Sequence, residues 1–279
     1  MKVTNPKLVR YAVLISCRNE EKNIGATLRA INRQTLQPMK VLVVNDGSTD
    51  RTGSVSRSLG ASTFRFTNRR HPVRGVNLAE ALNVGLNRLW GEDWDYLLKV
   101  DADSVLSETY AEDLMTRFET DESLGIASGN PQDEHIWKSR ASDGAKMFRR
   151  KCLTEVDWFP KCNAFDTLMI LRAKFLGWRV RSYEEIRYTQ TRTMRRESLS
   201  RWILSGRTRY RLGFPVWHTF LIFIFYAKQK PLVLGSFSMF MAHALSRLGG
   251  IPRPWSQTFN NYVGRFAMTE LLERIAVKS

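Results

Sequence analysis

Two aspartates, Asp101 and Asp103, directly follow a short apolar run, Tyr96–Val100, that is typical of a buried strand. Carboxylates at the exposed end of a strand form a hard oxygen site, which suits Mg²⁺ or Mn²⁺ and leaves coordination positions for phosphate oxygens. A divalent cation there would offset the charge that develops on a leaving diphosphate. Asp-X-Asp is also common in turns and helix N-caps, so the pattern alone leaves both interpretations open.

Two more polar clusters follow apolar runs in the same way. Residues 45–50 (NDGSTD) come after Val41–Val44, and residues 18–21 (RNEE) come after Tyr11–Cys17. Amide and carboxylate groups at 45–50 supply the donors and acceptors that read the edge of a nucleotide base. A tight turn that also caps the next helix explains the same residues.

A cationic stretch and a lone carboxylate complete the candidate set. Arg69, Arg70, His71 and Arg74 lie close together, and guanidinium groups bind diphosphate oxygens in a bidentate manner. A solvated basic loop is the alternative. Asp166 opens a helical stretch, where it could cap the helix or act as the general base that deprotonates an acceptor hydroxyl.

The elements that must position these residues alternate between strand and helix. Apolar runs predict strands at residues 11–17, 41–44, 62–66 and 96–100, and periodicity predicts helices at 24–31, 54–59 and 78–89. This alternation predicts an α/β fold with a mostly parallel sheet flanked by helices. Ligands bind outside the carboxyl ends of such strands, so we expect the three polar clusters to converge on one edge. Further along, residues 146–156 and 166–177 read as helices and 180–182 as extended.

The order of these motifs resembles that of a known family. The segments that carry the resemblance are LISCRNEEKNI, VVNDGSTD, VRGVNLAEALNVGL, LLKVDADSVL and EVDWFPKCNAFDTLMILRAKFLGWRV. Together they resemble glycosyltransferase family 2, whose members have the GT-A fold and transfer a sugar with inversion. The resemblance extends from about Tyr11 to Tyr188 and more weakly to residues 200–215.

The resemblance implies roles for individual residues and a donor of the nucleotide-diphosphate sugar class. The implied nucleoside-binding residues are Glu20, Asn45 and Asp46, and Arg74 would lie near the diphosphate. Asp101 and Asp103 would hold Mg²⁺ or Mn²⁺ and the donor, with Asp103 as the direct metal ligand. Asp166 would be the catalytic base of an in-line displacement.

Three positions depart from the family pattern. Asn45 stands where relatives carry an acidic residue, which leaves the base preference open. Phe165 stands where a glutamate usually precedes the base, so a degenerate donor-binding scaffold is an alternative to an active enzyme. Ser198 replaces the glutamine of the Gln-X-X-Arg-Trp motif of processive relatives, so we do not expect a processive polysaccharide synthase.

The last third of the chain differs from the rest in charge. Residues 187–279 carry +12 of the net charge of +16. We therefore divide the chain into a catalytic domain at 1–188 and a basic, apolar, helical region at 189–279. Such a surface attracts phosphates, anionic lipid or nucleic acid, and the residues we assign to an acceptor or lipid phosphate are Arg192, Arg195, Arg196 and Arg201.

Two uncharged runs in this region, Phe214–Ala227 and Pro231–Ser246, are 14 and 16 residues long. Both fall short of the ~20 apolar residues that span a bilayer. We expect interfacial or re-entrant helices on an anionic membrane surface, with a polyprenyl-phosphate-linked acceptor as one partner. A pair of core helices is the main alternative, and a spanning hairpin is a weaker one.

Other features narrow the class and the location. Residues 1–10 lack an apolar signal-peptide core, and three cysteines without metal-ligand spacing favour free thiols, so we expect the cytoplasmic face of a membrane and a peripheral or monotopic protein.

A nucleotidyltransferase is a rival function, but residues 18–21 differ from the Gly-rich basic loop of that class. A specific nucleic-acid binder would need basic residues interleaved with aromatics on a recognisable module, so we expect no specific nucleic-acid partner.

Overall fold

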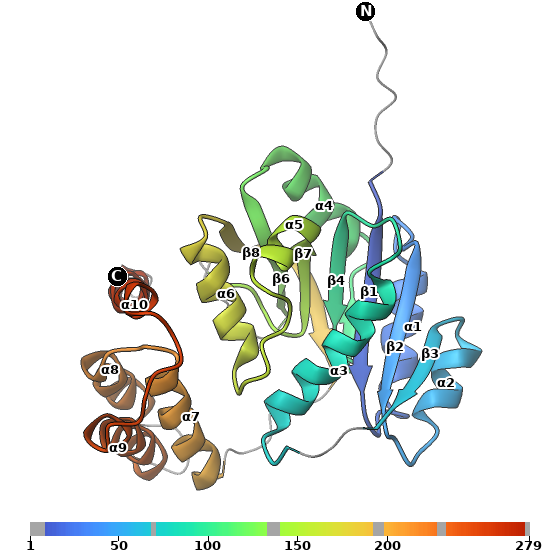
Figure 1. Cartoon of the computed structure of the whole chain (residues 1–279). Helices are drawn as coiled ribbons and strands as arrows, with labels where there is room; N and C mark the ends of the chain where they lie inside the picture. The colour runs from blue at the N-terminus through green and yellow to red at the C-terminus, as the bar shows by residue number, and fades with distance from the viewer. Residues whose placement is uncertain (1–8, 68–70, 133–139, 192–197, 228–232, 277–279) are drawn as a thin grey trace, which may run out of the picture. The chain divides into compact units, whose positions relative to one another are not determined.

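The computed structural model describes residues 9–67, 71–132, 140–191, 198–227 and 233–276 (Figure 1). The chain divides into two compact units, Met1–Arg192 and Thr193–Ser279. The first unit contains a β-sheet and the helices that pack on it, whereas the second is helical. The sequence predicts this change at residue 188.

In the described part of the first unit, eight strands form one sheet in the order β3-β2-β1-β4-β7-β6-β8-β5. The strands are β1 Tyr11–Cys17, β2 Lys40–Asp46, β3 Ser62–Phe66, β4 Tyr96–Val100, β5 Ser104–Leu106, β6 Leu124–Pro131, β7 Ala145–Arg149 and β8 Arg179–Gln190. All pairs among β1–β4 are parallel, as is β6 with β8. β7 is antiparallel to β4 and β6, and β5 to β8. The predicted α/β sheet is therefore confirmed as a mixed sheet.

Helices cover both faces of this sheet. One layer holds α1 Ile24–Asn32, α2 Thr52–Ser58 and α4 Tyr110–Thr120, and the other holds α3 Arg74–Leu89, α5 Arg150–Glu155 and α6 Phe165–Phe175. Burial on both faces explains why the strands read as continuous apolar runs rather than alternating ones. In β1, for example, Tyr11, Val13 and Ile15 face the first layer, whereas Ala12 and Leu14 face the second.

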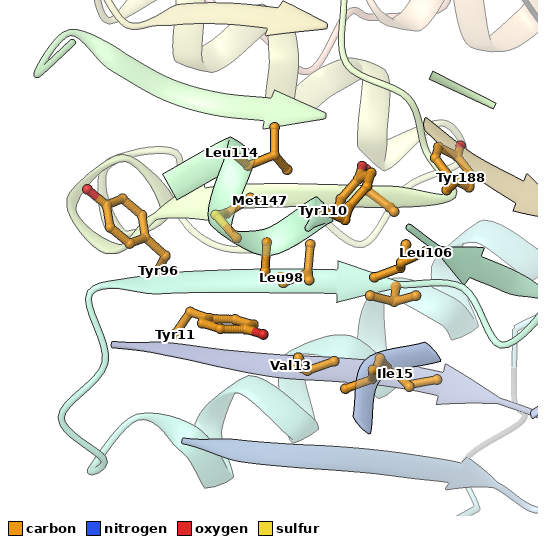
Figure 2. Packing of buried hydrophobic residues seen from close by; sticks show 14 of the residues in the cluster. Tyr11, Val13, Ile15, Tyr96, Leu98, Leu106, Tyr110, Leu114, Met147 and Tyr188 are labelled. Carbon is orange, nitrogen blue, oxygen red and sulfur yellow. The ribbon is translucent and has the colours of Figure 1, made fainter. Parts of the chain in front are cut away.

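Figure 2 shows the core on the first face, where β1 and β4 side chains such as Ile15 and Leu98 lie with Tyr110 and Leu114 of α4. On the second face α3 approaches the sheet closely at Gly85. A Cβ at Gly85 would lie 2.5 Å from Leu14 Cδ1, so only glycine fits without displacing the strand side chain. These two layers hold the carboxyl edge of β1, β2 and β4 in a fixed arrangement.

The predicted helix at residues 146–156 is wrong in its first part. Residues 145–149 form β7, and α5 begins at Arg150. Ala145 and Met147 face one layer and Phe148 faces the other, so the segment follows the two-residue period of a strand. Pairing with β4 and β6 on both sides outweighs the helical propensity of this short segment. The three cysteines are free, as expected.

The second unit contains α7 Leu199–Arg211, α8 Val216–Tyr226, α9 Leu234–Leu248 and α10 Gln257–Ala276. The two uncharged runs of the sequence supply α8 and α9, which pack through ring contacts such as Phe220 with Phe240, 5.5 Å between centroids. α7 and α9 meet where a Cβ at Gly206 would lie 2.0 Å from the Met239 carbonyl oxygen. Among the described helices, none combines the length and the apolar character needed to cross a membrane.

Polar side chains are buried between these helices. Arg209 Nη2 lies 2.7 Å from His218 Nδ1, and Arg209 Nε donates to Thr219 Oγ1 at 3.3 Å. Thr219 Oγ1 in turn lies 2.8 Å from His243 Nδ1. Burial, reinforced by the charge of Arg209, lowers the pKa of His243 to about 3. His243 is therefore neutral at physiological pH.

Candidate active site

Three polar segments meet at the carboxyl edge of β1, β2 and β4. β1 lies between the other two strands and is parallel to both. Residues 18–21, 45–50 and 101–103 therefore leave the sheet on the same side. The structure brings together the three clusters that the sequence predicts to converge there.

The first segment is held against the second by backbone hydrogen bonds. Asn19 has a left-handed backbone (φ 54°), and its N–H donates to Ser48 Oγ at 3.0 Å. The N–H of Glu20 donates to Thr52 Oγ1 at 2.8 Å. The Glu20 carboxylate accepts from Asn23 Nδ2 at 2.9 Å and is nearly buried. These contacts orient Glu20 at the edge of the sheet.

The second segment uses part of its polarity to make its own turn. Asn45 Oδ1 accepts the N–H of Ser48 at 2.9 Å, and a Cβ at Gly53 would lie 2.7 Å from Asn45 Nδ2. The amide therefore stabilises the loop and is packed closely by the following helix. Asp46 is buried beside it, and burial raises the pKa of this carboxyl while the nearby Arg18 opposes the rise.

The third segment follows β4. Asp101 Oδ1 accepts from Lys99 Nζ at 2.7 Å, and the side chain of Asp101 keeps 34% of its surface exposed. Lys99 Nζ also donates to the Asp143 carbonyl oxygen at 2.6 Å. The backbone carbonyl of Asp103 accepts the N–H of Thr191 at 2.8 Å, which fixes this segment against the end of β8.

The start of α3 lies beside the segment that carries Asp166. Arg74 is the first residue of α3 and its side chain is exposed. At the next position, a Cβ on Gly75 would lie 3.2 Å from both Cα and Oδ1 of Asn163. Arg74, which we predict to lie near the diphosphate, is therefore the neighbour of a residue that packs closely against the segment before α6. Arg69 and Arg70 lie outside the described residues.

Asp166 lies in the first turn of α6 within a group of charged side chains. Lys146 Nζ is 3.4 Å from Asp166 Oδ1 and 2.9 Å from Asp143 Oδ1. Burial and the negative charge of Asp143 raise the pKa of Asp166 to about 6, although Lys146 and Lys99 oppose the rise. Asp143, which is closer to the ammonium, has a lowered pKa despite desolvation. Asp166 is therefore the carboxylate of this group that accepts a proton most readily near neutral pH.

Sequence reasoning missed Lys99, Asp143 and Lys146. Lys99 and Lys146 are opposite each other in the β4–β7 register, and their side chains are 2% and 0% exposed. A buried lysine needs a nearby anion, because desolvation of an unpaired ammonium is costly. The one charged residue inside the apolar strand YLLKV is the signal that could have identified Lys99.

The arginines that we assign to the acceptor or lipid phosphate are not among the described residues of the first unit. Arg201 is an exposed residue of α7 in the second unit. Arg192, Arg195 and Arg196 lie outside the described residues. Their assignment to an acceptor or lipid phosphate stays a prediction.

Asp101 and Asp103 are the residues that could hold a divalent cation. In phosphate-transfer sites Mg²⁺ is typically bound by one or two carboxylates together with substrate phosphates. In the described part of the chain, no three His, Cys, Asp or Glu side chains are grouped to hold a metal ion. The chemistry of the two carboxylates after β4 fits a divalent cation, and Lys99 already partly neutralises Asp101.

Comparison with solved structures supports the fold. The structure is similar to that of the mannosyltransferase PcManGT from Pyrobaculum calidifontis in complex with GDP-Man and Mn²⁺, with a TM-score of 0.58, 17% identity, and coverage of 96% of this chain and 83% of that chain. It is also similar to residues 1–349 of S. aureus TarS in complex with UDP-GlcNAc, with a TM-score of 0.54, 17% identity, and coverage of 88% and 74%.

Comparison of sequences gives the family. The poly-beta-1,6-N-acetyl-D-glucosamine synthase of Staphylococcus aureus (strain COL) is 28% identical over 120 residues, which are 43% of this chain and 28% of that protein. The chain thus spans less than a third of this curated relative. The model of glycosyl transferase family 2 matches residues 12–202, which include all three polar segments, Asp166 and both buried lysines. With a GT-A-like fold and a match over most of its length, the chain belongs to glycosyl transferase family 2.

Proposed function

We propose that this chain transfers a sugar from a nucleotide-diphosphate donor to an acceptor hydroxyl or phosphate, with inversion at the anomeric carbon. The observation that carries the proposal is a line of contacts from Asp101 through Lys99, Asp143 and Lys146 to Asp166. This line joins the donor edge of the sheet to a carboxylate suited to proton transfer. Relatives solved with GDP-Man and UDP-GlcNAc support the donor class.

In the proposed reaction an acceptor hydroxyl gives its proton to an Asp166 carboxylate oxygen as the hydroxyl oxygen attacks the anomeric carbon. The bond from that carbon to the diphosphate oxygen breaks, and its electron pair leaves with the nucleoside diphosphate. A pKa near 6 leaves Asp166 ionised at neutral pH and able to accept a proton, which suits a general base.

The donor would be held at the carboxyl edge of the sheet. Glu20, Asn45 and Asp46 would contact the nucleoside, and Arg74 would lie near the diphosphate. Bound Mg²⁺ or Mn²⁺ would supply charge compensation for the leaving diphosphate, with Asp103 as its main protein ligand.

A calorimetric titration with UDP, GDP, CDP and ADP, with and without Mn²⁺, tests the donor site. We expect metal-dependent binding of one diphosphate, lost in Asp103→Ala and retained in Asp166→Asn. Transfer assays with the matching nucleotide sugars then separate two functions. Binding without transfer would identify a donor-binding scaffold, a possibility that rests on Phe165, whose ring is buried against Phe159 instead of adding a second carboxylate. Absence of binding to all four diphosphates would reject both.

The second unit has the features of a membrane-binding surface. Trp217, Phe220 and Ile224 form an exposed apolar stripe on α8 at spacings of three and four residues. α9 carries a similar stripe, with exposed Leu234, Phe237, Leu245 and Leu248. Apolar stripes with a strong positive charge match an anionic lipid surface. We propose that the protein lies at the cytoplasmic face of a membrane as a peripheral or monotopic protein, with a polyprenyl-phosphate-linked acceptor as its acceptor class.

Vesicle flotation tests this location. We expect binding to phosphatidylglycerol vesicles, weak binding to phosphatidylcholine vesicles, and release by salt, because screening weakens attraction to anionic headgroups. The double variant Trp217→Ser, Ile224→Ser is expected to bind at least about tenfold more weakly, since each buried apolar side chain contributes about 1.5–3 kcal/mol. Met268→Ser, at an exposed position on α10, is the matched control. Equal binding of both variants would exclude the α8 stripe.

A further inference from the structure

Lys146 occupies a position at which a lysine is costly. It is the second residue of β7, a strand that lies between β4 and β6 in the sheet, and its side chain is 0% exposed. A second buried lysine, Lys99, is its register partner on β4. Two ammonium groups on facing strands repel each other and lose their hydration, so each must be stabilised by carboxylates.

The contacts of Lys146 show which carboxylates these are. Its Nζ lies between Asp143 and Asp166, at 2.9 Å and 3.4 Å from the nearest oxygens. Lys99 instead contacts Asp101 and the backbone carbonyl of Asp143. The two lysines therefore have different partners. Lys99 contacts Asp101, a candidate metal ligand, whereas Lys146 contacts Asp166.

Among the described residues, the chain neighbours of Asp166 supply no positive charge. The preceding residue, Phe165, places its ring in the core and carries no charge. The residue before that, Ala164, has a left-handed backbone (φ 57°) and provides no side-chain cap for α6. Lys146 forms an ion pair with the Asp166 carboxylate, whose side chain is 16% exposed.

We propose that Lys146, held by Asp143, is a positioning residue that orients the Asp166 carboxylate toward the acceptor and keeps it charged. This proposal rests on the proposed function, because Asp166 is the base of that reaction. Lys146 makes no contact with substrate in this role and acts through Asp166. In this chain the base has no acidic neighbour, because Phe165 stands at the preceding position, and we expect Lys146 to orient the carboxylate.

The proposal predicts pH effects of opposite sign in two variants. Asp166 is influenced by Asp143 before β7, Lys146 on β7, Lys99 on β4 and Asp101 after β4. Lys146→Met removes a cation and leaves the Asp143 anion, so the pKa of Asp166 rises. Asp143→Asn removes an anion and leaves Lys146 to Asp166 alone, so the pKa of Asp166 falls. An opposite charge within about 4–6 Å shifts a carboxyl pKa by about 1–3 units, which sets the expected size of each change.

The experiment compares wild type with Lys146→Met, Lys146→Arg, Asp143→Asn and a control, Lys40→Met. Lys40 forms an ion pair with Glu92 and begins β2, far along the strand from its carboxyl end. The first readout is the carboxyl ¹³C titration of Asp166 in aspartate-labelled protein, assigned by its loss in Asp166→Asn. The second is the acid limb of the pH profile of kcat, with nucleotide affinity measured in parallel.

We expect both readouts to move upward by about one pH unit or more in Lys146→Met and downward in Asp143→Asn. Lys146→Arg restores values close to wild type, and the control leaves them unchanged. Nucleotide affinity stays within about twofold in every variant, which also shows that each is folded. A uniform loss of activity with no movement of either titration would assign Lys146 a purely structural role and overturn the proposal.

The two readouts also separate this proposal from the proposed function. The ¹³C titration requires no turnover. If wild type transferred no sugar but the Asp166 titration moved in opposite directions in the two variants, the charge relation would stand and the reaction would be wrong. If transfer occurred and neither titration moved, the reaction would stand and the role of Lys146 would be wrong. If Lys146→Met failed to fold, the downward shift expected in Asp143→Asn would still test the sign.

Discussion

The two units of this protein bury polar groups in different ways. In the first unit, the buried ammonium groups of Lys99 and Lys146 each contact a carboxylate. In the second, the buried side chains of His218, Thr219 and His243 are linked to one another and to the half-buried Arg209 by contacts that involve no carboxylate. The described residues of α7, α8 and α9 carry no Asp or Glu at all.

This difference indicates which groups balance the positive charges in each unit. The first unit balances its cations internally, and the balanced groups lie at the candidate site, where small changes in charge alter proton affinity. On α7, α8 and α9 of the second unit, the described residues include cations but no anions. This excess of positive charge favours binding of external anions, which is consistent with the proposed lipid surface.

The sharpest test of the first half of this comparison is Asp166→Asn. Removal of a general base costs about 10²–10⁴-fold in kcat, while nucleotide binding is unaffected. The same change should stabilise the fold at pH 8, because the pKa of Asp166 is raised from 3.8 to about 6 and ionisation therefore costs stability. Two pKa units correspond to at most about 3 kcal/mol.

The sign of that stability gain is set by linkage. Between pH 4 and 6 the folded protein binds more protons at Asp166 than the unfolded chain does, so its stability falls as the pH rises. The gain from Asp166→Asn is thus fully present above pH 6 and disappears near pH 4. Urea unfolding at pH 8 and pH 4 measures it, and a variant that was less stable at pH 8 would show that the carboxylate stabilises the fold.

His243 tests the second half of the comparison, with a smaller effect. Its folded pKa of about 3 lies below the unfolded value of 6.5, so the stability that the neutral ring contributes is complete above pH 6.5 and is lost as the pH falls. The loss is about 1.4 kcal/mol per pH unit below 6.5. Hydrogen exchange of α8 and α9 amides at pH 7 and pH 5, corrected for intrinsic rates, measures it.

His243→Gln should remove this acid sensitivity, and His71→Gln, at an exposed histidine of the first unit, should not. Together with Asp166, this gives the units opposite responses to acid at these two groups. Equal exchange at both pH values in wild type would mean that the histidine cluster gains an anion on protonation, and the comparison would fail.

The smallest expected effect concerns backbone strain beside the base. Ala164 has a φ of 57°, and non-glycine residues lose about 1 kcal/mol in this region. Ala164→Gly should therefore raise stability by about 0.5–1 kcal/mol. Gly60→Ala is the matched opposite, because Gly60 has a φ of 84° and no atom of the described residues lies within 4 Å of the place that a methyl group would take. This change should lower stability by about 1 kcal/mol through backbone strain alone. Thermal unfolding measures both.

Much of the first unit could be predicted from the sequence, because buried parallel strands are continuous apolar runs and their polar ends are short and distinct. β1, β2, β3 and β4 match their predicted ranges within a few residues. β7 was not predicted, since five residues with a lysine and an arginine carry too weak a strand signal. Its identity depends on β4 and β6, which are distant in sequence.

The charged group around Asp166 could not be predicted for a related reason. Lys146 and Asp166 are 20 residues apart, and Lys99 and Asp143 are 44 apart. Nothing local to a lysine in an apolar strand tells which carboxylate will lie beside it. The individual residues at the sheet edge were identified, but the cations that adjust their charge become evident only when β4 and β7 are paired.

The contact between Gly75 and Asn163 has a consequence for the order of catalysis. A Cβ at Gly75, at the start of α3, would lie 3.2 Å from the Cα and the side-chain Oδ1 of Asn163, three residues before Asp166, so the two segments approach each other closely. A donor diphosphate bound at the start of α3 would contact the region that packs against the segment before Asp166. Donor binding would therefore affect the orientation of the Asp166 carboxylate. We therefore expect a compulsory-order mechanism in which the donor binds first and the acceptor site is completed afterwards, so that product inhibition by the free nucleoside diphosphate is competitive with the donor alone.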